Sequence, residues 1–115
     1  MKLPNVDQVG ISQAKITNYL LSPVHTRGRH KAKFFESFGF DRQNWIEMAD
    51  ALKLHARLND VARVEASRFG SRYVIEGPIE SPDGRCPRVR TIWFISRGAS
   101  APYFVTAYPM PEVKP

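Results

Sequence analysis

The pattern of residues in this chain changes at Asn59, and that change most constrains the fold. Before Asn59, apolar residues recur at the three- and four-residue spacing of helices. After it, short runs alternate apolar and polar residues between Gly and Pro breaks, which is typical of antiparallel strands. Amphipathic helices followed by strands can bury their apolar faces against one another. The sequence therefore predicts an α+β domain with two to three N-terminal helices packed on a C-terminal four-stranded antiparallel sheet.

Three helical segments are expected in the first half of the chain. They cover about ten residues after Ser12, residues 29–37, and residues 41–58. Ser12 can cap the first helix, and Pro23 stops it, because a residue before proline avoids the helical conformation. Gly39 is placed to end the second helix.

Four strands are expected in the second half, at residues 61–69, 72–79, 87–96 and 103–108. In the third, alternation places Val89, Thr91, Trp93 and Ile95 on one face and Arg88, Arg90, Ile92 and Phe94 on the other. The first ten residues are expected to be an extended lead-in, and residues 109–115 a Pro-rich tail. Residues 1–115 are thus predicted to form a single domain.

Length and composition restrict the class of protein. A chain of 115 residues can bury a core without metal or disulfide support. Its one cysteine, Cys86, allows neither an intrachain disulfide nor a cysteine metal cage, and fits a reducing compartment. The N-terminus lacks the apolar core of a signal peptide, and no apolar run approaches the roughly 20 residues of a membrane helix. We therefore expect a soluble, cytoplasmic protein with no membrane partner.

The charge balance indicates an anionic partner. Seventeen Lys and Arg residues against eleven Asp and Glu give a net charge of +6. Such an excess favours nucleic acid, an acidic protein or an anionic surface as the partner. RNA is the partner that the rest of the sequence favours.

A cluster of histidines and cations lies between His25 and Lys33, namely His25, Arg27, Arg29, His30, Lys31 and Lys33. Cleavage of RNA through its 2′-hydroxyl needs a base, an acid and cations that stabilise the charged phosphorane. Histidine suits both proton roles, because its pKa lies near neutrality. Pro23 and Gly28 place the front of the stretch on a loop that would grip substrate, while Lys31 lies in the first turn of a helix, where anions bind favourably.

Further candidates lie on the strands. Arg72, Arg88 and Arg90 add cations, and the last strand ends in Thr106 and Tyr108, whose hydroxyls can orient a phosphate. The same pattern is also typical of a solvated basic loop and of outward-facing arginines on a sheet. The residues alone leave both interpretations open.

Other chemistries find no support in the sequence. The three histidines do not form a zinc-binding spacing, and no glycine-rich loop suited to nucleotides is present. Cys86 has no adjacent base that would make it a nucleophile. His55 is expected to be an ordinary helix residue. We therefore predict neither a metal nor a cofactor.

Several segments resemble a small bacterial family described only as a domain of unknown function. They are residues 2–5, 15–21, 25–35, 72–74, 82–85, 89–93 and 105–109, with the GRHKA run at residues 28–32 and the VTAYP run at 105–109 as the most specific. The layout is also similar to that of the barnase/EndoU/colicin/RelE superfamily of small metal-independent ribonucleases, many of which are toxins.

This second resemblance implies His30, Lys31, Thr106 and Tyr108 as catalytic residues. It also implies that Arg90 and Thr91 contact the substrate, beside His25, Arg27, Arg29 and Arg72.

Three hypotheses follow from the sequence. The chain is a toxin-like ribonuclease with an antitoxin or immunity partner, a non-catalytic basic module that binds nucleic acid or an acidic protein, or an immunity or accessory protein. Convergence of His30, Lys31, Arg90 and Tyr108 within hydrogen-bonding reach in one cleft would favour the enzyme, whereas side chains that point apart would count against it.

Overall fold

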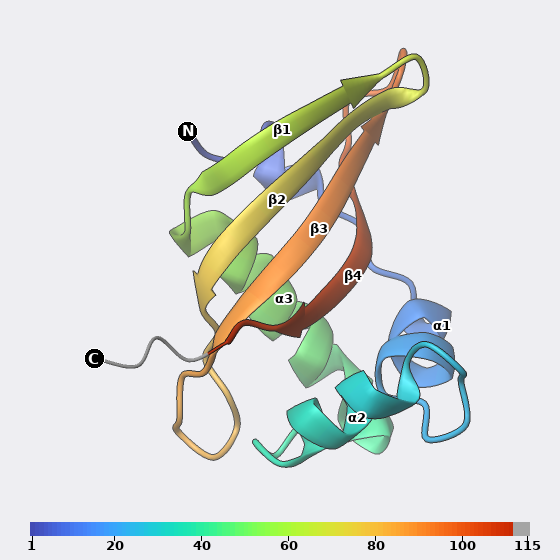
Figure 1. The fold of residues 1–115 in the computed structure, drawn as a ribbon, viewed down its shortest axis with the longest axis vertical. Helices are drawn as coiled ribbons and strands as arrows, with labels where there is room; N and C mark the ends of the chain where they lie inside the picture. Colours follow the sequence, from blue (N-terminus) through green and yellow to red (C-terminus); the bar gives the residue numbers. More distant parts are fainter. Residues whose placement is uncertain (112–115) are drawn as a thin grey trace.

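Short helices precede a single antiparallel sheet in the computed structural model, which describes residues 1–111 (Figure 1). The helical elements are η1 (Val6–Gln8), α1 (Gln13–Lys15), η2 (Ile16–Leu20), α2 (Arg29–Glu36), η3 (Arg42–Asn44) and α3 (Trp45–Leu58). The strands are β1 (Val61–Ser67), β2 (Gly70–Pro78), β3 (Arg88–Ser96) and β4 (Tyr103–Pro109). The predicted fold class is confirmed.

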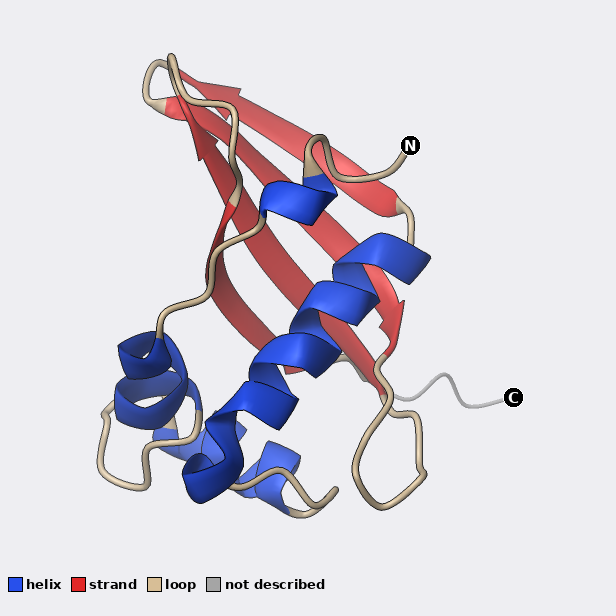
Figure 2. Ribbon diagram, turned by 180° about the vertical axis from the view of Figure 1, so that it is seen from behind, coloured by secondary structure: helices blue, strands red, loops and turns tan. Residues whose placement is uncertain are grey.

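The sheet is a meander in which neighbouring strands follow one another in the order β1-β2-β3-β4. Every neighbouring pair is antiparallel, as the short connections require. α3 lies across one face of the sheet, as Figure 2 shows, while α1, η2 and α2 gather near the lower end of β4. The face toward the viewer in Figure 1 has no helix lying across it among residues 1–111, and we call it the open face.

The core lies between α3 and the covered face of the sheet. Met48 and Leu52 of α3 and Trp93 of β3 are fully buried. Phe35 of α2 joins the same cluster, so the small helical layer at the end of the sheet is continuous with the main core. Burying side chains of this size contributes about 2–3 kcal/mol each, which fixes α2 and α3 against the strands.

The first predicted helix is present but irregular. Ser12 caps it as expected, its Oγ accepting from the backbone N–H of Lys15 at 3.2 Å. After one α-helical turn the backbone widens into a π-helical turn at Ile16–Leu20, in which the Leu21 N–H donates to the Ile16 carbonyl at 2.8 Å. Such turns are rare and are frequent at functional sites.

Several predicted boundaries shift by a few residues. The lead-in contains a 3-10 turn that begins after Asn5, a non-glycine residue with φ of 54°. Asp41 caps η3, and α3 itself begins at Trp45. β4 includes Pro109, so the sheet extends into the predicted tail. The end of that tail, residues 112–115, lies outside the described residues.

No helix in the described part of the chain is both long and apolar enough to cross a bilayer.

Candidate functional site

The open face carries side chains in rows that run across the strands. Residues that pair across antiparallel strands project to the same face, so the register defines each row. The rows contain, in turn, Glu76, Arg90 and Tyr108; Val74, Ile92 and Thr106; and Arg72, Phe94 and Tyr103. Successive rows are two residues apart along β2 and β3, or about 6.6 Å, and the step from Thr106 to Tyr103 in β4 takes three residues. Basic, hydroxyl and aromatic groups thus belong to one face of the sheet, with the fully buried Val74 and Ile92 between them in the middle row.

Lys31 extends from the first turn of α2 to the edge of this face. Its Nζ donates to Tyr19 Oη at 2.5 Å and to Thr106 Oγ1 at 3.0 Å. Tyr19 Oη and Thr106 Oγ1 are themselves 2.8 Å apart, so the three groups form a closed triangle. Each comes from a different element, η2, α2 and β4, and their junction is half-buried. We call these three residues the Lys31 cluster.

Tyr19 is the group whose proton affinity this arrangement changes most clearly. Partial burial on its own would raise the pKa of Tyr19. Hydrogen bonds with Lys31 and Thr106, together with the charges of Lys31 and Lys15, outweigh it and lower that pKa below its ordinary value. The Nζ atoms of Lys15 and Lys31 lie 4.7 Å and 4.9 Å from the centre of the Tyr19 ring. Relative to a tyrosine in water, the surroundings therefore stabilise the phenolate of Tyr19, the form that can accept a proton.

Arg90 and Tyr108 continue the site along the open face. Arg90 Nε donates to a Glu76 carboxylate oxygen at 2.6 Å, and its Cζ lies 5.5 Å from the centre of the Tyr108 ring. Arg90 also contacts Tyr108 Oη at 3.5 Å, a long distance for a hydrogen bond. Lys31 Nζ lies 5.9 Å from the centre of the same Tyr108 ring. Tyr108 thus connects two cations.

His25 lies on a loop, as predicted, and contacts Tyr19. Its ring meets the Tyr19 ring edge to face with 4.9 Å between centres. His25 Nδ1 accepts from the backbone N–H groups of Arg27 at 3.0 Å and Gly28 at 3.1 Å. Because both partners can only donate, neutral His25 carries its proton on Nε2. It can donate a hydrogen bond from that atom but is not arranged to act as a base.

His30 lies outside the Lys31 cluster. It is exposed and, with Arg29, lines a separate hollow of about 470 Å³ beside α2. Successive residues on a helix are about 100° apart around its axis, so Lys31 and His30 serve different surfaces. Of the four residues whose convergence would favour an enzyme, Lys31, Arg90 and Tyr108 gather while His30 does not. Arg27 and Arg29 are likewise exposed.

Thr91 and Arg72 lie on opposite faces of the sheet. Thr91 is fully buried on the covered face, where its Oγ1 accepts from Trp93 Nε1 at 2.9 Å and lies 3.0 Å from His55 Nδ1. A substrate on the surface cannot reach it in this conformation. Arg72 is on the open face, two rows from Arg90, and pairs with Glu65 at 2.6 Å.

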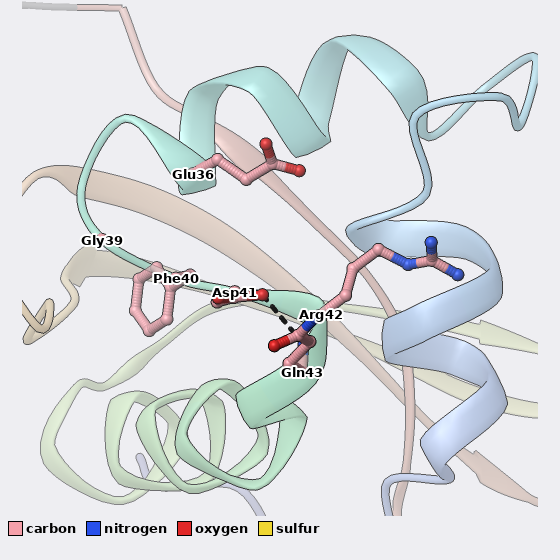
Figure 3. A pocket seen from close by; sticks show the side chains of 6 residues that line it. All are labelled: Glu36, Gly39, Phe40, Asp41, Arg42 and Gln43. Atoms are coloured by element: carbon pink, nitrogen blue, oxygen red, sulfur yellow. Dashed lines mark hydrogen bonds between the residues drawn. The ribbon is translucent and has the colours of Figure 1, made fainter.

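A further hollow, of about 520 Å³, lies between the end of α2 and the start of α3 (Figure 3). It is lined by Glu36, Gly39, Phe40, Asp41, Arg42 and Gln43. Two of its polar groups have structural partners: Asp41 Oδ1 accepts from the Gln43 N–H at 2.9 Å, and Arg42 Nε donates to the Thr17 carbonyl at 2.9 Å. The first contact caps η3 and the second joins η3 to η2, so both are structural.

Among residues 1–111, no three His, Cys, Asp or Glu side chains gather as metal ligands would.

The sequence did not identify Tyr19 and Glu76 as site residues. The spacing of Tyr19 matches that of buried Ile16 and Leu20, which is typical of an apolar residue on the first helix. The alternation of β2 places Glu76 on the face shared with Arg72, but only the strand register shows that it meets Arg90. A tyrosine at the edge of an apolar helix face was the available signal for Tyr19.

Fold and site together define a small basic α+β domain with one helix-covered sheet face and one open polar face. The chain belongs to the family described as Domain of unknown function (DUF6883), which matches residues 2–111. The predicted membership of a family of unknown function is thereby confirmed.

The fold is similar to that of a chain in a solved "Contact-dependent growth inhibition toxin - immunity protein complex from Klebsiella pneumoniae 342". That likeness has a TM-score of 0.66 at 17% identity and covers 90% of this chain and 99% of the other. It shows a shared fold. Among proteins with curated descriptions, none matches this chain.

Proposed function

We propose that this protein is a metal-independent ribonuclease of the toxin type, with its reactive centre at the Lys31 cluster. The observation that carries the proposal is the contact of Tyr19 Oη with Lys31 Nζ at the edge of an open, basic face, which lowers the pKa of Tyr19 below its ordinary value. A tyrosine whose phenolate is stabilised by neighbouring cations can serve as a base without a metal. An open face suits a polymer, whereas small-molecule sites are usually enclosed.

Each step of RNA cleavage has a group suited to it. The Tyr19 phenolate takes the proton of a ribose 2′-hydroxyl while the O2′–P bond forms. Lys31 and Arg90 stabilise the negative charge of the phosphorane. As the P–O5′ bond breaks, the Tyr108 hydroxyl gives its proton to the leaving O5′. The products are a 2′,3′-cyclic phosphate and a 5′-hydroxyl. Tyr19 then releases a proton to water and Tyr108 takes one up from water, which restores both tyrosines.

His25 and Thr106 have supporting roles in this proposal. The Nε2–H of His25 is free of the two backbone contacts that hold Nδ1, and it can donate to a phosphate oxygen. Thr106 holds Tyr19 and Lys31 in place through its hydroxyl. His30, the first catalytic candidate from the sequence, has no role in the scheme because it belongs to the hollow with Arg29.

The fold comparison supports a toxin-related role. A chain that shares this fold occurs in a complex of a growth-inhibition toxin with its immunity protein. A basic protein with net charge +6 would need a partner with an acidic surface for tight inhibition. We therefore include a cognate antitoxin or immunity protein in the proposal.

Purified protein incubated with transfer RNA and total RNA, with and without EDTA, tests the activity. We expect cleavage that EDTA does not inhibit and that leaves cyclic phosphate ends. Lys31→Met should lower the rate by about 10²–10³-fold, the usual loss for one electrostatic stabiliser. Tyr19→Phe should lower it by about 10²–10⁴-fold, as expected for a general base.

His30→Ala is the matched control, because it changes the neighbouring residue on the same helix. It should cleave like wild type while Lys31→Met does not. If His30→Ala alone abolishes cleavage, the centre lies in the hollow beside α2 and the assignment is wrong. Intact RNA after prolonged incubation at high enzyme concentration would reject the activity as a whole.

A non-catalytic binding module is the second candidate, and one observation favours it. Lys31, Tyr19 and Thr106 already satisfy one another, and Arg90 pairs with Glu76, which is also how a structural junction is built. A module would bind RNA with a steep salt dependence and leave it intact. An immunity or accessory protein would instead be tolerated when overproduced in cells, where a ribonuclease would stop growth.

A further inference from the structure

Two aromatic rings lie on the open face in the row next to Thr106, on the side away from Arg90. Phe94 and Tyr103 pair across β3 and β4, with 5.7 Å between ring centres and planes tilted by 50°. Tyr103 is 48% exposed, although large aromatic side chains usually lie in the core. The core lies on the covered face, so burial does not explain this pair.

Gly70 makes room for one of these rings. A Cβ at Gly70 would lie 2.8 Å from a carbon of the Phe94 ring, and φ at this residue is 147°. The Phe94 ring thus lies against the bare backbone of β2, an arrangement that glycine permits in a sheet. The position of the ring on the face is therefore set by the strand pairing and not by a flexible loop.

Cations surround the same end of the sheet. Arg72 pairs directly with Phe94 across β2 and β3. Arg68 lies in the β1–β2 turn, and Arg97 follows β3 with its N–H donating to the Phe69 carbonyl at 2.8 Å, so both are at this end. Aromatic faces combined with arginines are the elements from which proteins bind single-stranded nucleic acid.

We propose that Phe94 and Tyr103 form a base-stacking platform for single-stranded RNA, with Arg72 contacting its phosphates. This inference rests on the ribonuclease function above and adds the substrate class. Phe94 lies two residues of β3 from Ile92, which pairs with Thr106 of the Lys31 cluster, and four residues from Arg90. These separations are about 7 Å and about 13 Å at about 3.3 Å per residue. A stacked strand advances about 3.4 Å per nucleotide, so about two to four nucleotides span the distance, and fewer if the strand is extended.

The geometry selects unpaired RNA over duplex. A base can stack on Tyr103 only if its face is free, and in a duplex both faces are covered by neighbouring pairs. Stacking is tolerant of sequence, because every base has a π-face. The platform therefore sets the strandedness of the substrate and the distance of the cut from the stacked base, and not its identity.

The test uses the full chain and a fluorescein-labelled 12-nucleotide oligouridylate that is 2′-O-methylated, so that it binds without being cleaved. Fluorescence anisotropy gives Kd. Tyr103→Ala should weaken binding by about 5-fold to 100-fold, the usual range for one stacked base, whereas Tyr103→Phe should bind like wild type. Phe94→Leu, which keeps most of the apolar volume, should weaken binding by a similar factor.

Two controls separate stacking from charge and from folding. The same oligonucleotide with abasic sites should bind wild type and Tyr103→Ala equally, since it has no base to stack. Arg72→Ala should reduce the slope of log Kd against log salt by about 1, as loss of one phosphate contact does. Arg57→Ala is the control for charge. Arg57 is also exposed and also forms an ion pair, with Asp7, but it lies on α3 behind the sheet, so its loss should leave the slope unchanged.

The platform is wrong if Tyr103→Ala binds the oligouridylate like wild type, if the duplex of the same length binds as tightly, or if wild type shows no binding. Cleavage separates this failure from failure of the ribonuclease proposal. A protein that cleaves RNA but is insensitive to Tyr103→Ala lacks the platform and keeps the activity. A protein that never cleaves, yet loses binding on Tyr103→Ala, keeps the platform and is a binding module.

Discussion

Replacing Thr91 by Val tests whether this residue serves the core or the substrate. In the structure, Thr91 links two buried groups: its Oγ1 accepts from Trp93 Nε1 at 2.9 Å and lies 3.0 Å from His55 Nδ1. His55 Nε2 lies 3.0 Å from the Gly77 carbonyl and must donate to it, so Nδ1 has no proton in the neutral ring. The Thr91 hydroxyl therefore donates to His55 and accepts from Trp93, and valine can do neither.

The expected loss follows from these two contacts. Thr91→Val leaves the Trp93 N–H and His55 Nδ1 buried without a partner, at about 1–3 kcal/mol each. The sum, about 2–6 kcal/mol, is a large part of the roughly 5–15 kcal/mol that stabilises a domain. Thr91→Ser is the matched control: it keeps the hydroxyl and removes one methyl group, which costs about 1 kcal/mol.

Urea unfolding measures the difference. With a slope of about 1–3 kcal/mol per M, a loss of 3 kcal/mol lowers the midpoint by about 1–3 M. Thr91→Val should therefore unfold well before Thr91→Ser, and both should bind RNA like wild type under conditions in which they are folded. Equal midpoints for the two variants would refute the hydrogen-bonding argument. Weaker RNA binding by folded Thr91→Val, which lacks the hydroxyl, would instead support the substrate role expected from sequence resemblance.

Two further predictions concern stability. Burial, the largest cause, outweighs the backbone hydrogen bonds of His55 and lowers its pKa below 6.5, so the unfolded chain takes up a proton that the folded protein rejects. The free energy of unfolding should therefore fall as pH drops below about 6.5, by up to about 1.4 kcal/mol per pH unit until the lowered pKa of His55 is reached. Urea titrations that show rising stability over this range would contradict the prediction. A Cβ at Gly28 would lie 1.9 Å from the Tyr19 carbonyl oxygen. Gly28→Ala should therefore destabilise the protein by about 1–3 kcal/mol, measured by thermal unfolding, and should lower RNA cleavage. Gly10→Ala is the control: a Cβ there has open space around it, so stability and cleavage should not change.

Most of the fold was predictable because local patterns agree with the tertiary structure. Ser12 caps the first helix, Gly39 follows α2 with φ of 100°, and the alternation of β3 matches its two faces. The π-helical turn and the turn after Asn5 were missed, because neither has a distinct pattern in the sequence.

The candidate site was predictable only in part. Lys31, Arg90 and Tyr108 were chosen for their chemistry, and the fold brings them together. His30 and Lys31 are adjacent in sequence, and only the orientation of α2 on the sheet decides which of them faces β4. That orientation depends on long-range packing, which a pattern of local residues does not contain.

The faces of β4 show most clearly what alternation could not supply. Strict alternation would place Phe104 and Thr106 on the same face. The pairing with β3 instead passes from Ile92↔Thr106 to Trp93↔Phe104, so Val105 is an extra residue in β4. This bulge lets Phe104 pack on Trp93 in the core while Thr106 meets Lys31 on the open face. Because a one-residue change in register exchanges the faces of a strand, the bulge is what allows β4 to serve the core at one end and the site at the other.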